Sequence, residues 1–259
     1  MLMAMYQSKY FFKLLEFQWE RTKAYPIRLI ISLSWVIFGF IPQFFFWYII
    51  AQSTNTLPYT TKEIILYFLF SMGLFYNLNQ INQYFNTIAR GEVVTSVIKP
   101  MSLTANYFSI FFSTIFINKL PNLIIITIIG CFIVGITSSI LAAIFFLFGL
   151  ILGCTFFVCF FLLMFWMRNN WGVKWGIDIL ILFASGTWIP LDILPKFWGG
   201  LLLNLPFQLM FYTPAKIFLG QITPTFWLIL QYVFWIIILY IIARILEYYG
   251  LKYYEQLGG

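Results

Sequence analysis

The chain has 259 residues, of which 62% are hydrophobic and only 9% are charged, with 15 basic and 8 acidic side chains. Since about a quarter of the residues in a soluble domain are charged, the composition excludes a soluble globular enzyme. A membrane-crossing helix needs about 20 mainly apolar residues, so the apolar content suffices for about six crossings. The sequence contains no histidine, which excludes Ser-His and Cys-His catalytic arrangements. Its three cysteines have no CxxC spacing, so no metal site is predicted.

Residues 1–26 are predicted to form a helix that lies in the membrane–water interface. Charged side chains recur at helical spacing between Tyr6 and Arg21, and aromatic and aliphatic side chains occupy most of the opposite side. This amphipathic pattern is typical of a helix whose apolar face enters the headgroup region. A solvated helical leader is the alternative interpretation.

Six apolar segments are predicted to cross the membrane: 27–52, 63–87, 103–135, 140–167, 175–187 and 224–246. Thr60 and Glu63 have the spacing of a capping box at the start of the second segment. Pro121 is predicted to kink the third segment, although residues 103–121 could instead form a surface helix before a shorter crossing. Thr223 followed by Pro224 is typical of a helix start.

The distribution of basic residues predicts the orientation of the chain. If the N-terminus is inside, eleven basic residues lie on the inner side (Lys9, Lys13, Arg21, Lys23, Arg28, Arg90, Lys99, Arg168, Lys174, Arg244, Lys252) and three on the outer side (Lys62, Lys196, Lys216). The fifteenth, Lys119, lies within the third segment and is assigned to neither side. Cytoplasmic loops carry the excess of lysine and arginine, so both termini are predicted to be cytoplasmic. This topology accounts for the net charge of +7 without a nucleic-acid partner.

A polar stripe is predicted on the inner half of the second crossing. Asn79, Gln83, Asn86 and Arg90 follow one another at intervals of three or four residues, so they share one helix face. Polar side chains at membrane depth are costly unless they meet another helix or water. The stripe is therefore predicted to form a helix contact, such as a dimer contact, or to line a substrate path.

A short helix is predicted on the inner side after this stripe, over residues 91–98. Gly91 can end the preceding helix, and Pro100 prevents a new one from continuing through it. The residues between them suit an amphipathic helix that projects from the membrane and docks in a groove of another protein. A plain connecting loop is the alternative.

Residues 188–222 are predicted to form short re-entrant or interfacial helices on the outer side. Half of the ten prolines lie between Gly186 and Pro224, yet the segment remains aromatic and aliphatic. The pieces between the prolines are too short to cross a membrane, and broken backbone at membrane depth must be buried in protein or face a cavity. A structural plug at the outer mouth is the alternative.

The order of these features resembles the type-2 (ABC-2-like) permease subunit of bacterial ATP-binding-cassette exporters. Three local matches carry the resemblance: Arg90-Gly91-Glu92 through Ile98-Lys99-Pro100, Ile189-Pro190-Leu191-Asp192-Ile193-Leu194-Pro195, and Leu205-Pro206-Phe207 through Tyr212-Thr213-Pro214 and Leu219-Gly220. The resemblance implies an all-α polytopic protein of the bacterial plasma (inner) membrane, surrounded by membrane lipids. It also implies export, two ATPase subunits as partners, and a second permease chain that is identical or related.

The resemblance also implies roles for individual residues. The segment 91–98 would be the coupling helix, with ATPase-coupling residues Arg90, Gly91, Glu92, Thr95, Lys99 and Pro100. The outer segment would close the exit, with gate residues Pro190, Asp192, Pro195, Trp198, Pro206 and Pro214. The chain has no Gly-x-x-x-x-Gly-Lys-Ser/Thr phosphate loop, so ATP and Mg²⁺ are expected in the partner and no cofactor in this chain.

Two other classes of function remain open at this point. Ion-driven carriers usually bury ionisable residues in mid-membrane, and here only Lys119 could qualify, which weakens the alternative of a stand-alone carrier or channel. An intramembrane enzyme would have to use Glu92, Asp178 or Asp192, which do not converge in this topology. Asp178 follows Lys174 by four residues, so the two are predicted to form an ion pair on one helix.

Overall fold

A computed structural model describes residues 2–53, 57–75, 93–167 and 170–256. Within these ranges all regular structure is helical, in agreement with the predicted all-α class. In chain order the elements are α1 (Leu2–Ala24), α2 (Ile27–Ser53), α3 (Thr61–Phe75), α5 (Val94–Val97), α6 (Leu103–Ile133), α7 (Ile136–Leu163), η2 (Met164–Trp166), α8 (Asn170–Ala184), η3 (Leu191–Ile193), α9 (Lys196–Leu203), η4 (Pro206–Leu209), α10 (Tyr212–Phe218) and α11 (Phe226–Gln256).

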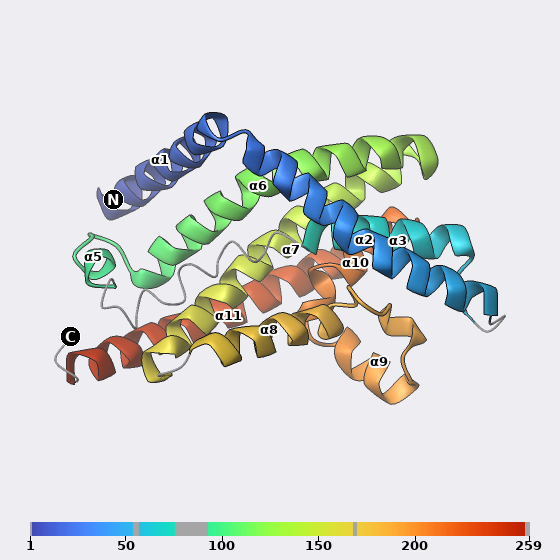
Figure 1. Cartoon of the computed structure of the whole chain (residues 1–259). Coiled ribbons are helices and arrows are strands. Elements are labelled where there is room, and N and C mark those ends of the chain that lie inside the picture. The colour runs from blue at the N-terminus through green and yellow to red at the C-terminus, as the bar shows by residue number, and fades with distance from the viewer. Residues whose placement is uncertain (1, 54–56, 76–92, 168–169, 257–259) are drawn as a thin grey trace.

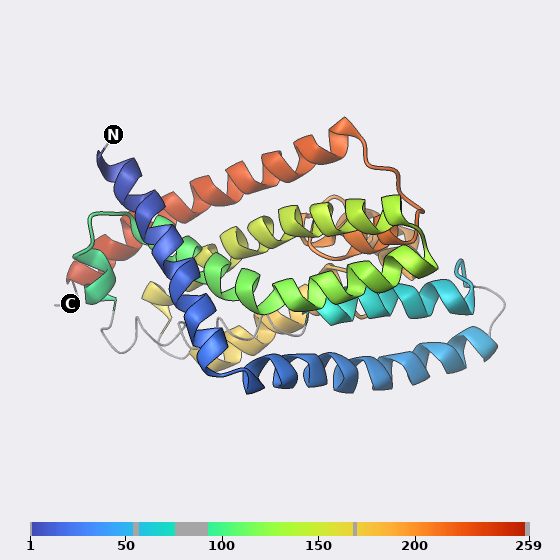
Figure 2. The ribbon, with the colours of Figure 1, turned by 90° about the horizontal axis from the view of Figure 1, so that it is seen from above.

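The long helices lie side by side around α7. Helix α7 contacts α6, α11 and α10, and most of its side chains are buried. Figure 2 shows that α1 crosses the direction of the long helices near the end where α5 and the C-terminal part of α11 lie. It is fixed to α6 by a hydrogen bond from Gln18 Nε2 to Thr114 Oγ1 (3.1 Å). The N-terminal segment is thus helical, as predicted, and its position in the membrane–water interface stays a prediction.

Close backbone contact lets the outer segment pack directly on α7. A Cβ atom at Gly149 would lie 2.9 Å from the carbonyl oxygens of both Leu209 and Met210. Since real Cβ atoms essentially never approach other atoms so closely, a glycine is needed at this position. The phenol of Tyr232 on α11 donates to the Leu209 carbonyl oxygen (2.6 Å). Helices α7 and α11 together therefore hold η4 and α10 in place.

Two described helices are long and apolar enough to cross a membrane, the stretches Ile136–Trp166 and Phe226–Gln256. The helix segments Leu103–Asn118 and Leu120–Ile133 meet at a bend of 47° and form a third crossing if they are taken as one broken span. The bend lies next to Pro121, which removes a backbone hydrogen bond and crowds the preceding turn. The predicted count of six crossings depends partly on residues 76–92, which lie outside the described residues, and it stays a prediction.

Helix α11 is longer than the predicted crossing at 224–246. Its 31 residues span about 46 Å at about 1.5 Å per residue, whereas the hydrocarbon core of a bilayer is about 30 Å thick. It begins at Phe226 because Thr225, rather than Thr223, lies at its start, where Leu228 N donates to Thr225 Oγ1 (3.4 Å). The C-terminal end of α11 therefore continues beyond the predicted crossing.

Two local predictions are confirmed by side-chain contacts. Thr60 N donates to Glu63 Oε2 (2.8 Å) and Glu63 N donates to Thr60 Oγ1 (3.3 Å), as a capping box requires. Lys174 Nζ lies 3.7 Å from Asp178 Oδ2, one helical turn away. Both contacts follow from spacing along one helix.

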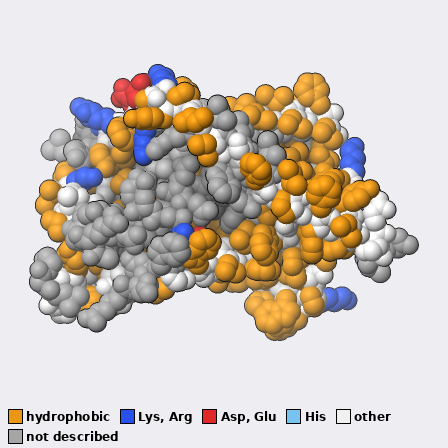
Figure 3. All heavy atoms as spheres, viewed as in Figure 1, with side chains coloured by type: hydrophobic (Ala, Val, Ile, Leu, Met, Phe, Trp, Pro, Cys, Tyr) orange, Lys and Arg blue, Asp and Glu red, His pale blue; other side chains and the backbone are white. Residues whose placement is uncertain are grey.

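The outside of the bundle is strongly apolar. Figure 3 shows hydrophobic side chains over most of the described surface on the face it presents, with charged ones mainly at its margins. Exposed aromatic side chains on α2 and α11 include Phe38 (70%), Phe45 (57%), Trp227 (78%) and Phe234 (57%). A water-soluble monomer rarely exposes apolar patches of this extent, so these faces require hydrocarbon or an apolar partner.

Candidate partner-docking foot and outer polar cluster

Residues 93–101, which we call the foot, form a compact projection at the end of the molecule that also carries the C-terminus (Figure 1). Helix α5 is its centre. Val93 is fully buried and Ser96 is 6% exposed, whereas Val94, Val97 and Ile98 are 45%, 46% and 78% exposed. One side of the foot thus packs on the bundle while the other presents apolar side chains outward.

The buried side of the foot is tied to both α1 and α6. Ser96 Oγ donates to the Tyr107 hydroxyl (3.4 Å) on α6. Lys99 Nζ donates to the Tyr10 hydroxyl (2.9 Å) on α1 and to Asn106 Oδ1 (3.4 Å) on α6. The ammonium group also lies 4.9 Å from the centroid of the Tyr10 ring. The Lys99 side chain is thus directed toward α1, and the foot is held as a fixed platform.

The start of α6, directly after the foot, is held by a carboxylate from α11. Leu103 N donates to Glu247 Oε1 (2.8 Å), and Thr104 N (3.2 Å) and Thr104 Oγ1 (2.6 Å) donate to Oε2. Arg244 Nη1 lies 2.7 Å from the same Oε2. Glu247 is buried, so these donors replace the water that a carboxylate would otherwise bind.

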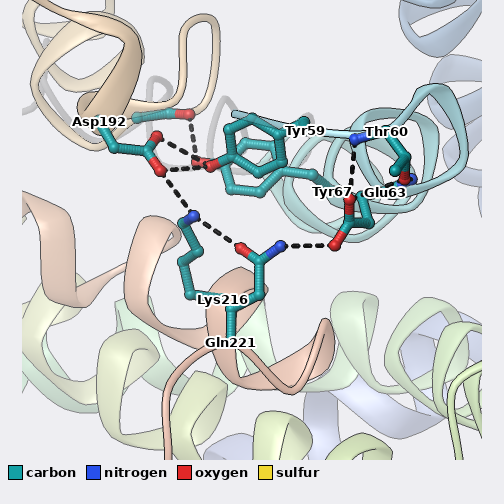
Figure 4. A network of polar contacts seen from close by, with 8 residues as sticks. Tyr59, Thr60, Glu63, Tyr67, Asp192, Lys216 and Gln221 are labelled. Carbon is teal, nitrogen blue, oxygen red and sulfur yellow. Dashed lines mark hydrogen bonds and ion pairs between the residues drawn. The ribbon is translucent and has the colours of Figure 1, made fainter. Parts of the chain in front are cut away.

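A second group of polar side chains lies at the opposite end of the bundle. We call Tyr59, Glu63, Asp192, Lys216 and Gln221 the outer cluster (Figure 4). Lys216 Nζ on α10 donates to Asp192 Oδ2 (2.6 Å) and Gln221 Oε1 (2.7 Å). Gln221 Nε2 donates to Glu63 Oε1 (2.8 Å). The cluster therefore joins the outer segment to the start of α3.

Tyr59 completes the outer cluster from the loop before α3. Its hydroxyl donates to both oxygens of Asp192 (2.8 and 3.0 Å), and its ring centroid lies 4.3 Å from Lys216 Nζ. Burial and the nearby Asp192 carboxylate raise the pKa of the Tyr59 phenol well above its ordinary value. The phenol therefore stays protonated and acts as a donor to Asp192.

The chemistry of the outer cluster is that of a structural clamp. Each of its charged groups faces an opposite charge or a hydrogen-bond partner within the chain. Among the residues that the structure describes, no group of three His, Cys, Asp or Glu side chains could hold a metal ion. The arrangement fixes the position of helices and supplies no nucleophile–base pair.

The predicted outer-gate residues fall around this clamp. Asp192 belongs to it, Pro195 precedes α9, and Pro206 begins η4. Pro190 and Pro214 are buried, whereas Trp198 is 55% exposed on α9. Short helices thus occupy the predicted outer segment, and their re-entry into the membrane stays a prediction.

The predicted coupling residues are only partly within the described residues. Thr95 lies in α5, Lys99 contacts α1 and α6, and Pro100 is exposed between α5 and α6. Other predicted site residues lie outside the described residues, namely Arg90, Gly91 and Glu92 of the coupling group and Asn79, Gln83 and Asn86 of the polar stripe. The described helix of the foot covers Val94–Val97, the central part of the predicted range 91–98.

Sequence reasoning missed two residues that the fold makes important. Glu247 lies just beyond the predicted crossing at 224–246 and receives no role from the sequence pattern, and Lys216 is predicted only as an outer basic residue. The spacing of Arg244 and Glu247, three residues apart near the end of an apolar helix, is a signal for an ion pair. Nothing in the local pattern indicates that the carboxylate also caps α6.

An apolar cavity lies between α1, α6, α7 and α11. Its volume is about 560 Å³, and its lining includes Phe12, Phe108, Val158 and Ile237 but no charged side chain. Cavities of this size and character bind largely apolar ligands. The cavity thus has the size and polarity for a hydrocarbon chain.

An all-helical bundle, apolar helices of membrane-crossing length and a short helix with outward apolar side chains are typical of a polytopic membrane permease. A model of the family described as "ABC-2 family transporter protein" matches residues 8–258. The chain belongs to this family, which confirms the predicted resemblance. It is therefore a multi-pass membrane protein and a permease component of an ABC transporter. No curated protein and no solved structure matches the chain.

Proposed function

We propose that the chain is the membrane-spanning subunit of an ATP-driven exporter and works as a dimer with a second permease chain. Two separate ATPase subunits would drive the pair by docking on the foot. One observation carries this proposal: the foot is anchored through Val93 and Ser96 while Val94, Val97 and Ile98 stay exposed. An exposed apolar patch on a rigid base is typical of a protein–protein interface.

The arrangement of the ends supports a cytoplasmic position for the foot. Figure 1 places the N-terminus, α5 and the C-terminus toward the same end of the molecule, away from α3 and α10. The excess of predicted inner-side basic residues indicates that this end faces the cytoplasm. In a bacterial plasma membrane, the foot would therefore meet ATPases on the side where ATP is available.

The mechanism follows from the movement of a docked foot. When ATP binding draws the two ATPases together, the feet would move with them and shift a two-state bundle between inward-open and outward-open forms. The outer segment, held by the clamp at Asp192 and Lys216, would close the exit between cycles. The exposed apolar faces of α2 and α11 would be covered by lipid and the second chain.

The test is recovery of the ATPase with the tagged permease from native membranes. In Ile98→Asp, a charge replaces an apolar side chain that is 78% exposed, so folding should be preserved while docking is lost. We expect at least about tenfold less ATPase, as for an interface hot spot. Tyr249→Asp is the matched control, because Tyr249 is 58% exposed near the inner end of α11 but off the foot.

Two results would contradict the proposal. One is equal ATPase recovery with wild type and Ile98→Asp. The other is the absence of any ATPase from the wild-type preparation combined with transport by the permease alone, which would favour a stand-alone carrier. Charge reversal at Arg90 and at Glu92 extends the test to the predicted coupling residues before the foot.

A further inference from the structure

The first turn of α6 obtains its hydrogen-bond acceptors from a distant part of the chain. The first amide groups of a helix have no partner within the helix. Here Ala105 N donates to the local cap Ser102 Oγ (3.2 Å), but Leu103 N and Thr104 N donate to Glu247, 144 and 143 residues away. Glu247 therefore acts as an N-cap that α11 supplies to α6.

The contact has the features of a strong one. Glu247 is 7% exposed, and its carboxylate receives three donors from the helix start and a fourth from Arg244. A negative charge at a helix N-terminus is stabilised by the helix dipole, and hydrogen bonds to charged groups are stronger than neutral ones. Helices α6 and α11 are therefore held together at this end by one side chain.

The foot is joined to the same turn of α6 by a short, folded connection. Lys99 N donates to the Ser96 carbonyl oxygen (3.4 Å), and Met101 N donates to the Lys99 carbonyl oxygen (2.7 Å). The Met101 side chain is buried. Since Ser102 directly follows this connection, the foot has little freedom to move without the start of α6.

We propose that Glu247 is a positioning residue that latches the foot to the last helix, so that a displacement of the foot is passed to α11. Helix α11 reaches the outer segment, where Tyr232 donates to the Leu209 carbonyl oxygen (2.6 Å). The route from foot to outer segment thus runs through the first turn of α6, Glu247 and α11. The use of this latch in transport rests on the proposed function, but the latch itself does not.

The latch is tested by hydrogen exchange on the purified full-length permease in nanodiscs, without nucleotide or ATPase. In Glu247→Gln, the amide oxygen can accept from one backbone N–H, but the NH₂ group then faces the second. We expect exchange of the Leu103 and Thr104 amides to become about tenfold to a hundredfold faster, in line with the loss of hydrogen bonds to a charge. Exchange should also increase in the foot and around Tyr249, although the foot makes no described hydrogen bond to Glu247.

Two further variants separate the latch from a general loss of folding. Glu255→Gln is the matched control, since Glu255 is an exposed carboxylate about two turns further along α11. Amide hydrogen exchange in this variant should equal that of the wild type. Thr104→Val removes one donor (2.6 Å) and keeps the charge, so about fivefold faster exchange at the same amides is expected. If Glu247→Gln does not fold, the exchange rates of Thr104→Val decide whether the Glu247 carboxylate holds the start of α6.

Coupling between the foot and α11 must also be reciprocal. Val93→Ala, which loosens the buried side of the foot, should speed exchange around Tyr249 in wild type but not in Glu247→Gln. The latch is refuted if neither Glu247→Gln nor Thr104→Val changes the exchange rates of the Leu103 and Thr104 amides. It is also refuted if these two amides exchange faster while the exchange rates of the foot stay at their wild-type values. Failure to recover an ATPase contradicts the proposed function and leaves the exchange result standing.

Discussion

Replacing Asp192 by asparagine removes one charge from the outer cluster and keeps the size of the side chain. In the wild type, Lys216 Nζ lies 2.6 Å from Asp192 Oδ2, and the two side chains are 9% and 29% exposed. After the substitution, the buried ammonium group retains only Gln221, the asparagine oxygen and two aromatic rings. The variant therefore tests whether the clamp is an ion pair or a set of neutral contacts.

The loss of unfolding free energy expected for Asp192→Asn lies between two known limits. Breaking a buried ion pair by removing one partner costs about 3–5 kcal/mol, and an exposed pair is worth about 0–1 kcal/mol. Because Lys216 is buried, Asp192 is partly exposed and asparagine can still accept a hydrogen bond, we expect about 2 kcal/mol. For a chain of this size, that cost lowers the melting temperature by about 4–8 °C.

The assay is thermal unfolding of the purified permease, with two comparisons. Glu20→Gln breaks an ion pair of 2.9 Å to Lys23 whose side chains are 62% and 55% exposed, so its melting temperature should stay within about 2 °C of wild type. The double variant Asp192→Asn with Lys216→Met leaves no unpaired charge and should return to within about 1 kcal/mol of wild type. An unchanged melting temperature in Asp192→Asn, or a double variant less stable than either single one, would refute this reasoning.

Two further predictions concern single positions. Tyr59→Phe removes the donor to Asp192 and should lower the unfolding free energy by about 1–2 kcal/mol, as checked by thermal unfolding. The pKa of Tyr59 is raised in the fold and is about 10 in an unfolded chain. The neutral phenol therefore stabilises the fold fully below pH 10, and this stabilisation is lost as the pH rises above 10. The decline in melting temperature above pH 10 should be shallower in the variant, and equally steep curves would contradict the assignment. Gly149→Ala should cost about 1–3 kcal/mol because its Cβ would meet backbone carbonyls. Gly176→Ala, with no atom within 4 Å of its Cβ apart from its chain neighbours and its own helix backbone, should be neutral or stabilising in the same assay.

Local chemistry in the sequence predicted the parts of the fold that depend on neighbouring residues. The capping box of Thr60 and Glu63 and the ion pair of Lys174 and Asp178 depend only on spacing along one helix. The helical conformation of the N-terminal segment and the bend near Pro121 also follow from hydropathy pattern and backbone chemistry. These features could be predicted because all of their partners lie within one or two turns.

Contacts between distant segments could not be predicted in the same way. Glu247 reaches a helix start more than 140 residues away, and hydropathy marks it only as a charge near the end of a crossing. Lys216 lies in an apolar stretch, and its pairing with Asp192 depends on how η3 and α10 fold back on α3. Such pairings are set by tertiary packing, which a single sequence does not encode in its periodicity.

The most direct test of the account is site-specific photo-cross-linking from Val97 in native membranes. Val97 is 46% exposed on the foot, so a photoreactive residue there should form an adduct with a protein that carries an ATP-binding phosphate loop. The same probe at Phe132, which is 87% exposed at the far end of α6, should give no such adduct. If Val97 instead captures no ATPase and is labelled from outside the cell by a membrane-impermeant reagent, the proposed ATP-driven permease with a cytoplasmic foot is contradicted.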